Sequence, residues 1–264
     1  MISRRAMLCA CAMSCAAAAS AQPVEACADL AGLPPFVYSI NPGTDTAAGV
    51  SVDLLRQVAS DIGWRLQIDL LPWARCVHDA QAGRYGIVLN VVREEAQSYH
   101  LLLSRPYYKL HGVYVYSGRV HGLGLAVRSR TQLLQMRICG MSGHRFESFG
   151  VPTQLVDRGT SRSFEQLAAK LHLGRCDLAI TTREEFAGTY LKNPKVSEQI
   201  ADGSLRIEPL PEVSEPSLHF GVPEAAPQAR VMLDALNASL ARLERQGIMT
   251  QLIDRHLDER SPRR

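Results

Sequence analysis

The sequence lacks the features of a membrane-spanning protein and of a metal-binding protein. After its N-terminal region, the 264-residue chain has no run of 18 uninterrupted apolar residues, whereas a membrane-spanning helix needs about 20. It has no C-x-x-C or H-x-x-x-H spacing, and its eight histidines are scattered, which argues against a zinc site. The absence of a G-x-S-x-G sequence argues against an α/β-hydrolase.

A strong excess of charge is also missing. The chain has 29 lysines and arginines against 26 aspartates and glutamates, a formal net charge of +3. Nucleic-acid binding depends on a clear positive excess, so it is not expected here. No low-complexity linker or heptad repeat divides the chain, which argues against two domains on a flexible tether.

The N-terminus has the pattern of an export signal. Arg4 and Arg5 precede the small apolar run Ala6–Ala19, and cleavage is expected after Ala21. The arginine pair leaves both general secretion and twin-arginine export open, and Cys15 lacks the usual context of a lipoprotein cysteine. Removing residues 1–21 lowers the formal charge to +1. We therefore expect a soluble protein outside the cytoplasm, periplasmic or secreted.

The first half of residues 22–264 alternates strands with helices. Apolar side chains recur at helical spacing in Val50–Ile62, and Gly63 follows them. The expected elements of this β-α-β-α-β unit are strands at Val24–Ala28, Arg65–Leu71 and Ile87–Val92 and helices at Val50–Ile62 and Ala74–Gln81.

The second half repeats this alternation and ends in helices. Val231–Gln246 has a strong helical pattern of apolar residues followed by Gly247. The expected elements are strands at Arg137–Gly140, Gln154–Asp157 and Asp177–Thr181 and helices at Ser163–Leu173, Val231–Gln246 and Met249–Leu257.

Several motifs in this order resemble one family. Pro34–Tyr38, Gly49–Leu55 and Leu71–Arg75 resemble the first lobe of the family-3 extracellular solute-binding proteins. Its later elements are resembled by Gly174–Thr181, Asn237–Leu240 and Gly247–Leu257. Each piece is weak alone, but together they span most of residues 22–264.

The resemblance implies an α/β type II periplasmic-binding-protein fold. Two lobes, each a mixed sheet flanked by helices, would hold a small polar solute in the cleft between them, without a cofactor. It also implies a monomer that delivers its solute to the membrane permease of an ABC importer. The implied boundaries are 1–21 (signal peptide), 22–112 (first lobe), 113–217 (second lobe), 218–257 (return to the first lobe) and 258–264 (charged tail).

Four cysteines remain after signal cleavage, and an even number in an exported chain suggests disulfides. Of the three possible pairings, Cys27–Cys76 and Cys139–Cys176 are favoured, because each would lie within one lobe. Buried free thiols are the alternative.

The resemblance also suggests which residues contact a solute. Trp73 falls where the family places an aromatic platform, which would offer apolar area and attraction for cations. Alternatively, Trp73 only covers the core of the first lobe. The expected contacts are Phe36, Tyr38, Trp73, Arg75, Asn90, Arg93, Gln97, Ser142, Gly143, His144, Arg145 and Thr182.

The sequence departs from the family at two charged contacts. Gln97 stands where amino-acid receptors have the arginine that clamps the solute carboxylate, and a neutral amide cannot replace that bidentate contact. Arg93 is a candidate substitute, or else a solvent-exposed arginine. Thr182 stands where the family has an acidic partner for the solute ammonium.

These departures lead to the hypothesis of an anionic solute. Arg75, Arg93, His144 and Arg145 would make the cleft more cationic than that of an amino-acid receptor. Two further functions remain open, namely a sensor with a degenerate cleft and a periplasmic dehydratase similar to cyclohexadienyl dehydratase. In the second, Glu184 or Glu185 would act as a general acid.

Overall fold

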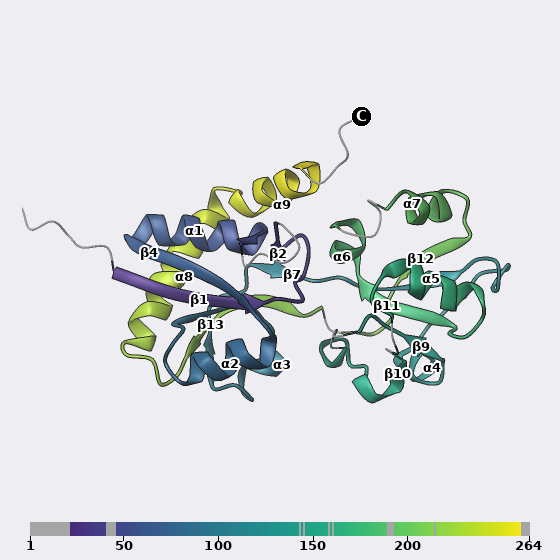
Figure 1. Ribbon diagram of the computed structural model, residues 1–264, viewed down its shortest axis with the longest axis horizontal. Helices are drawn as coiled ribbons and strands as arrows, with labels where there is room; N and C mark the ends of the chain where they lie inside the picture. The colour runs from purple at the N-terminus through teal and green to yellow at the C-terminus, as the bar shows by residue number, and fades with distance from the viewer. Residues whose placement is uncertain are drawn as a thin grey trace, which may run out of the picture.

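The computed structural model describes residues 22–259, except 41–45, 143, 145, 158, 160, 189–192 and 214. Figure 1 shows two α/β lobes side by side, each built around its own sheet. The expected two-lobed fold is therefore confirmed. The predicted signal peptide and residues 260–264 of the predicted tail lie outside the described residues.

The first lobe has a mixed sheet of strand order β4-β1-β5-β13-β6, with β7 paired to β13. Strands β4, β1 and β5 are parallel, whereas β13 runs antiparallel to both of its neighbours. Its strands are β1 (Gln22–Asp29), β2 (Tyr38–Ser39), β3 (Ala47–Ala48), β4 (Trp64–Leu71), β5 (Ile87–Val91), β6 (Leu101–Leu103), β7 (Tyr108–Lys109) and β13 (Ser217–Pro223). Its helices are α1 (Val50–Ile62), α2 (Trp73–Gln81), α3 (Arg93–Ala96), α8 (Ala229–Arg245) and α9 (Ile248–Glu259).

The second lobe has a five-stranded sheet of order β10-β9-β11-β8-β12. Its strands are β8 (Gly112–Ser117), β9 (Ile138–Cys139), β10 (Val156–Asp157), β11 (Leu178–Thr182) and β12 (Leu205–Pro209). Its helices are α4 (Arg130–Leu134), α5 (Phe164–His172), α6 (Arg183–Gly188) and α7 (Pro194–Ala201), with 3₁₀ turns η1 (Glu147–Phe149) and η2 (Thr153–Leu155).

Local sequence signals explain where the main helices begin and end. Helix α1 ends at Gly63, which adopts the left-handed conformation (φ 75°) that glycine accepts readily. A side chain at Gly49 (φ 126°) would come within 2.2 Å of the backbone oxygen of Phe36, so only glycine fits at that entry to α1. At α5, the hydroxyl of Ser163 accepts a hydrogen bond from the Gln166 N–H and caps the helix.

Each sheet is buried on both faces. In the first lobe, α1, α8 and α9 cover one face through residues such as Leu55, Leu240 and Leu252, and α2 covers the other (Figure 1). Burial of these apolar side chains supplies most of the stabilisation. No helix in the described ranges combines the length and apolar character needed to cross a bilayer.

Two disulfides fix helices and loops to the sheets, one in each lobe. Cys27 of β1 is bonded to Cys76 of α2, and Cys139 of β9 is bonded to Cys176. Their Cα–Cα distances of 5.7 and 5.8 Å are ordinary for disulfides. Both predicted pairs are confirmed.

The chain passes between the lobes twice. It leaves β7 and enters β8 at Gly112, and it returns from β12 to β13 at Ser217. Strand β13 then lies between β5 and β6 in the middle of the first sheet. The chain after residue 216 therefore adds strand β13 to the sheet of the first lobe.

Candidate functional site: a cavity between the lobes

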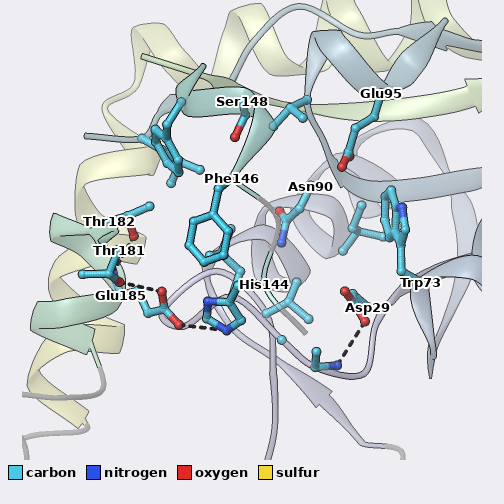
Figure 2. A pocket seen from close by; sticks show the side chains of 18 residues that line it. Asp29, Trp73, Asn90, Glu95, His144, Phe146, Ser148, Thr181, Thr182 and Glu185 are labelled. Atoms are coloured by element: carbon cyan, nitrogen blue, oxygen red, sulfur yellow. Dashed lines mark hydrogen bonds and ion pairs between the residues drawn. The ribbon is translucent and has the colours of Figure 1, made fainter. Parts of the chain in front are cut away.

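A cavity of about 120 Å³ has walls from both lobes (Figure 2). This volume suits a small solute, because cavities of about 150 Å³ hold molecules the size of benzene. The residues that line it are Asp29, Ala31, Gly32, Leu33, Val37, Trp73, Leu89, Asn90, Val92, Glu95 and Leu110 from the first lobe and His144, Phe146, Ser148, Phe149, Thr181, Thr182 and Glu185 from the second.

The wall of the first lobe is built at the carboxyl ends of parallel strands. Asp29 ends β1, Trp73 begins the helix after β4, and Glu95 lies on α3 just after β5. Ligands of open α/β sheets bind at this edge. The Trp73 side chain is 9% exposed and meets Tyr99 edge to face, with ring centroids 6.0 Å apart.

Asn90 reaches the same wall through an unusual backbone conformation. Its φ of 57° is in the left-handed region, which asparagine tolerates better than most residues. Its side-chain oxygen accepts a hydrogen bond of 2.6 Å from the Tyr107 hydroxyl. That bond fixes the orientation of the amide in the cavity.

The wall of the second lobe holds a carboxylate in a fixed position. Glu185, 5% exposed, accepts a hydrogen bond of 2.8 Å from the Thr181 hydroxyl. The Glu185 backbone N–H donates to the Thr182 hydroxyl at 3.0 Å. The Nε2 atom of His144 lies 3.5 Å from the Glu185 carboxylate. Figure 2 shows these residues on the side of the cavity away from Trp73.

A second buried carboxylate, Glu184, lies where the chain passes between the lobes. It accepts hydrogen bonds from the Tyr108 hydroxyl (3.1 Å) and the His111 backbone N–H (3.1 Å), and the His111 Nδ1 atom is 2.6 Å away. Burial and the Glu184 charge raise the pKa of Tyr108 to about 12. Glu184 therefore ties α6 of the second lobe to the end of the first.

The charged groups of the cavity are mostly acidic. Asp29, Glu95 and Glu185 line it together with His144, and no lysine or arginine does so within the part of the chain that the structure describes. Of the four residues predicted to make the cleft cationic, His144 lines the cavity, Arg75 and Arg93 do not, and Arg145 lies outside the described residues. Arg75 is 61% exposed and pairs with Asp79 one turn later on the same helix.

The structure brings four of the predicted contact residues together and leaves others outside the cavity. Trp73, Asn90, His144 and Thr182 line it. Arg93 and Gln97 are exposed and absent from its lining, so Arg93 does not take the place of a carboxylate-binding arginine there. Gly143 and Arg145 lie outside the described residues.

Three further predicted contacts have other surroundings. Phe36 is fully buried in the core of the first lobe, with its ring centroid 4.8 Å from that of Tyr108. The Tyr38 hydroxyl lies 3.0 Å from Nδ1 of His256, on α9. Ser142 is exposed, and its backbone N–H donates to the Ser161 carbonyl oxygen.

Sequence reasoning named Glu185 only as a possible general acid, and it did not place Asp29 or Glu95 in the cleft. A signal for them existed, because Asp29, Glu95 and Glu185 each end or closely follow a strand that was predicted correctly. The rule that ligands bind beyond the carboxyl ends of strands points to such positions. No pattern in the sequence indicated Phe146 and Phe149, which come from the 3₁₀ turn η1 and the residue before it.

The described residues give no support for a metal centre. One group of possible ligands, Cys139, Asp157 and Cys176, has atoms within 4.8 Å of one another. However, its two sulfur atoms are joined in a disulfide, so they cannot act as thiolate ligands.

Two α/β lobes that enclose a solute-sized cavity define a two-lobed binding protein. The family model of the bacterial extracellular solute-binding proteins, family 3, matches residues 27–259. The chain therefore belongs to this family. No curated protein sequence matches the chain.

Solved structures with the same fold share little sequence with the chain. An amino acid ABC transporter substrate-binding protein from Streptococcus pneumoniae, bound to L-arginine, has a TM-score of 0.66 at 15% identity, covering 91% of this chain and 97% of its own. An ancestral amino-acid-binding protein, described as a precursor of cyclohexadienyl dehydratase, has a TM-score of 0.60 at 15% identity, covering 89% and 95%. A histidine kinase sensor domain with similarity to periplasmic binding proteins has 0.62 at 15% identity, covering 90% and 97%. At such identities the likeness establishes the fold and leaves the solute open.

Proposed function

We propose that this protein is a periplasmic solute-binding protein that captures a small polar solute and presents it to the permease of an ABC importer. The observation that carries the proposal is the cavity of about 120 Å³ with walls from both lobes. Membership of the family and the likeness to an ABC transporter substrate-binding protein support it.

The arrangement suits capture by closure of the lobes. Trp73, Asn90 and Glu95 belong to one lobe and His144 and Glu185 to the other. A solute that touches both walls gains contacts that exist only when the lobes are together. It therefore shifts the population toward the closed state, which the permease would recognise.

The proposal is tested by combining binding with shape. The purified protein is screened by thermal shift against amino acids, dicarboxylates, small aromatic acids and amines, and each binder is examined by small-angle X-ray scattering. We expect at least one class to raise the melting temperature and reduce the radius of gyration. A scattering profile that never changes, with no stabilising compound in any class, would contradict the proposed function.

A dehydratase is the second candidate, and the position of Glu185 favours it. The carboxyl group of Glu185 lines the cavity close to His144, so a proton donor or acceptor would be available to a bound substrate. The test is phenylpyruvate release from prephenate. Turnover that is lost in Glu185→Gln would support the enzyme, whereas binding without turnover is expected of a receptor.

A further inference from the structure

We infer that helix α6 couples solute binding to closure of the lobes, and that Glu184 and Gly188 on this helix are positioning residues for solute capture. The inference rests on the proposed function, because closure matters to a protein that captures a solute between its lobes. The cavity lining in the described part of the chain includes neither residue. Both therefore act on a solute through the position of the helix.

Helix α6 is fixed to the second lobe. It follows β11 directly, and its Phe186 side chain is 2% exposed in the core of that lobe. The ring of Phe186 meets that of Phe164 edge to face, with centroids 5.3 Å apart. Figure 1 shows the helix on the side of the second lobe that faces the first. A movement of the second lobe therefore carries α6 with it.

Glu184 and Gly188 lie on one face of α6, because residues four positions apart in a helix lie one above the other. The carboxylate of Glu184 accepts hydrogen bonds from the Tyr108 hydroxyl and the His111 backbone N–H, both at 3.1 Å. The Tyr108 ring packs on Phe36 in the core of the first lobe, with centroids 4.8 Å apart. The bond from Tyr108 to Glu184 therefore joins the two lobes.

At the other end of this face, Gly188 packs directly on the Pro34–Pro35 turn of the first lobe. A Cβ atom at position 188 would lie 3.1 Å from the Cδ atom of Pro35, whereas carbon atoms in good contact are about 3.5–4.0 Å apart. The turn is held in place, because the Pro35 carbonyl oxygen accepts a hydrogen bond of 3.0 Å from the Val50 N–H at the start of α1. This contact leaves no room for a side chain while the lobes are together.

The same segment also forms part of the cavity wall. Glu185, which follows Glu184, lines the cavity together with Thr181 and Thr182 at the end of β11. A solute that contacts this wall and Trp73 of the first lobe holds α6 close to the first lobe. Because such coupling is reciprocal, a change that weakens the packing of α6 on the first lobe must also weaken solute binding.

The test replaces Gly188 by leucine, whose side chain does not fit between α6 and the Pro34–Pro35 turn. The lobes are separate bodies, so opening relieves the overlap. Gly122→Leu is the matched control, because a Cβ atom at that exposed position of the second lobe has no neighbour within 4 Å. Small-angle X-ray scattering and isothermal titration calorimetry are carried out on both variants and the wild type. Scattering is recorded without solute and with L-arginine, glutarate or putrescine as probes.

We expect Gly188→Leu to have a larger radius of gyration than Gly122→Leu. It should also bind the tightest of the three probes at least about tenfold more weakly than the control, as overpacking of the closed state predicts. An affinity equal to that of Gly122→Leu would overturn the inference.

Gly188→Ala distinguishes positioning from a loss of folding. Gly188 does not have a positive φ, and alanine is more favourable than glycine in a helix. The midpoint of urea unfolding should therefore stay the same or rise, while the affinity for the same probe falls about fivefold. A fall in both stability and affinity would indicate a purely structural role and would contradict the inference.

Two tyrosine variants test the contribution of Glu184. Tyr108→Phe removes a donor to its carboxylate, so the same probe should bind about threefold or more weakly. Tyr114→Phe is the control, because its hydroxyl donates to the Leu125 carbonyl oxygen within the second lobe. It should lower stability and leave the affinity unchanged. An unchanged affinity in Tyr108→Phe would contradict the role of Glu184.

The outcomes separate this inference from the proposed function. If the wild type closes on a probe and Gly188→Leu does so equally well, the inference fails and the receptor stands. If the wild type binds neither these probes nor any compound of the thermal-shift screen, the proposed function fails. Scattering without solute then decides the inference, and equal radii of gyration for the two leucine variants would overturn it.

Discussion

The hydrogen bond between Thr181 and Glu185 determines how the cavity carboxylate is held, and its contribution can be measured. The Thr181 hydroxyl lies 2.8 Å from the carboxylate, and each residue is 5% exposed. A hydrogen bond to a charged group contributes about 1.5–3 kcal/mol. Thr181→Val removes the donor at nearly constant shape, so the buried carboxylate loses that stabilisation.

A double-mutant cycle isolates this bond. In Glu185→Leu the carboxylate is gone, so the further change Thr181→Val should cost little. We expect the two substitutions to be coupled by about 1.5–3 kcal/mol in the free energy of unfolding. The free energies are measured by urea unfolding, followed by circular dichroism at neutral pH.

The neighbouring threonine supplies a matched control. The Thr182 hydroxyl accepts a hydrogen bond from the backbone N–H of Glu185, which Glu185→Leu leaves in place. Thr182→Val should therefore show coupling to Glu185→Leu below about 0.5 kcal/mol. Equal coupling for both threonines would refute the assignment of the Thr181 bond to the carboxylate.

Three further predictions concern binding, the disulfide and pH. The chain has two tryptophans; solute binding should change the fluorescence of Trp64→Phe, which keeps the cavity indole, but not that of Trp73→Phe, and a signal in the latter would place the solute elsewhere. Replacing Cys27 and Cys76 by alanine, which opens a loop of 49 residues, should lower the free energy of unfolding by about 4 kcal/mol in urea titrations, and a loss under about 1 kcal/mol would contradict the prediction. A hydrogen bond from a histidine on α9 holds the pKa of Asp53 below its ordinary 3.8, so its stabilising contribution is present above about pH 4 and lost as the pH falls through the lowered value. Unfolding midpoints measured from pH 5 to 3 should thus fall less steeply in Asp53→Asn, and parallel curves would refute this.

In the first lobe, the local sequence pattern was enough to predict the main helices. Val50–Ile62 was predicted with the bounds that α1 has, because apolar spacing and Gly63 act within a few residues of one another. Strands β1, β4 and β5 were also found in place. By contrast, β13 was not predicted, since its position between β5 and β6 depends on partners more than 100 residues earlier in the chain.

The candidate site was predicted less well than the fold. Trp73 lies in the cavity as expected from the motif around it. Arg75 does not, because a nearer partner, Asp79, lies one helical turn away on the exposed face of α2. The motif placed Arg75 at the start of α2 but did not fix the direction of its side chain, which the ion pair with Asp79 holds on the exposed face.

The sequence by itself determined the α/β class, the main helices and the likeness to the extracellular solute-binding proteins, and it favoured the two cysteine pairs that the structure shows. These follow from short-range periodicity and from motifs in a fixed order, which do not require knowledge of long-range contacts. Only the tertiary structure decided that Asp29, Glu95 and Glu185 line one cavity, because they are far apart in the chain and meet where the two lobes face each other. Which side chains share that cavity depends on how the two walls are assembled, and no local pattern in the sequence encodes it.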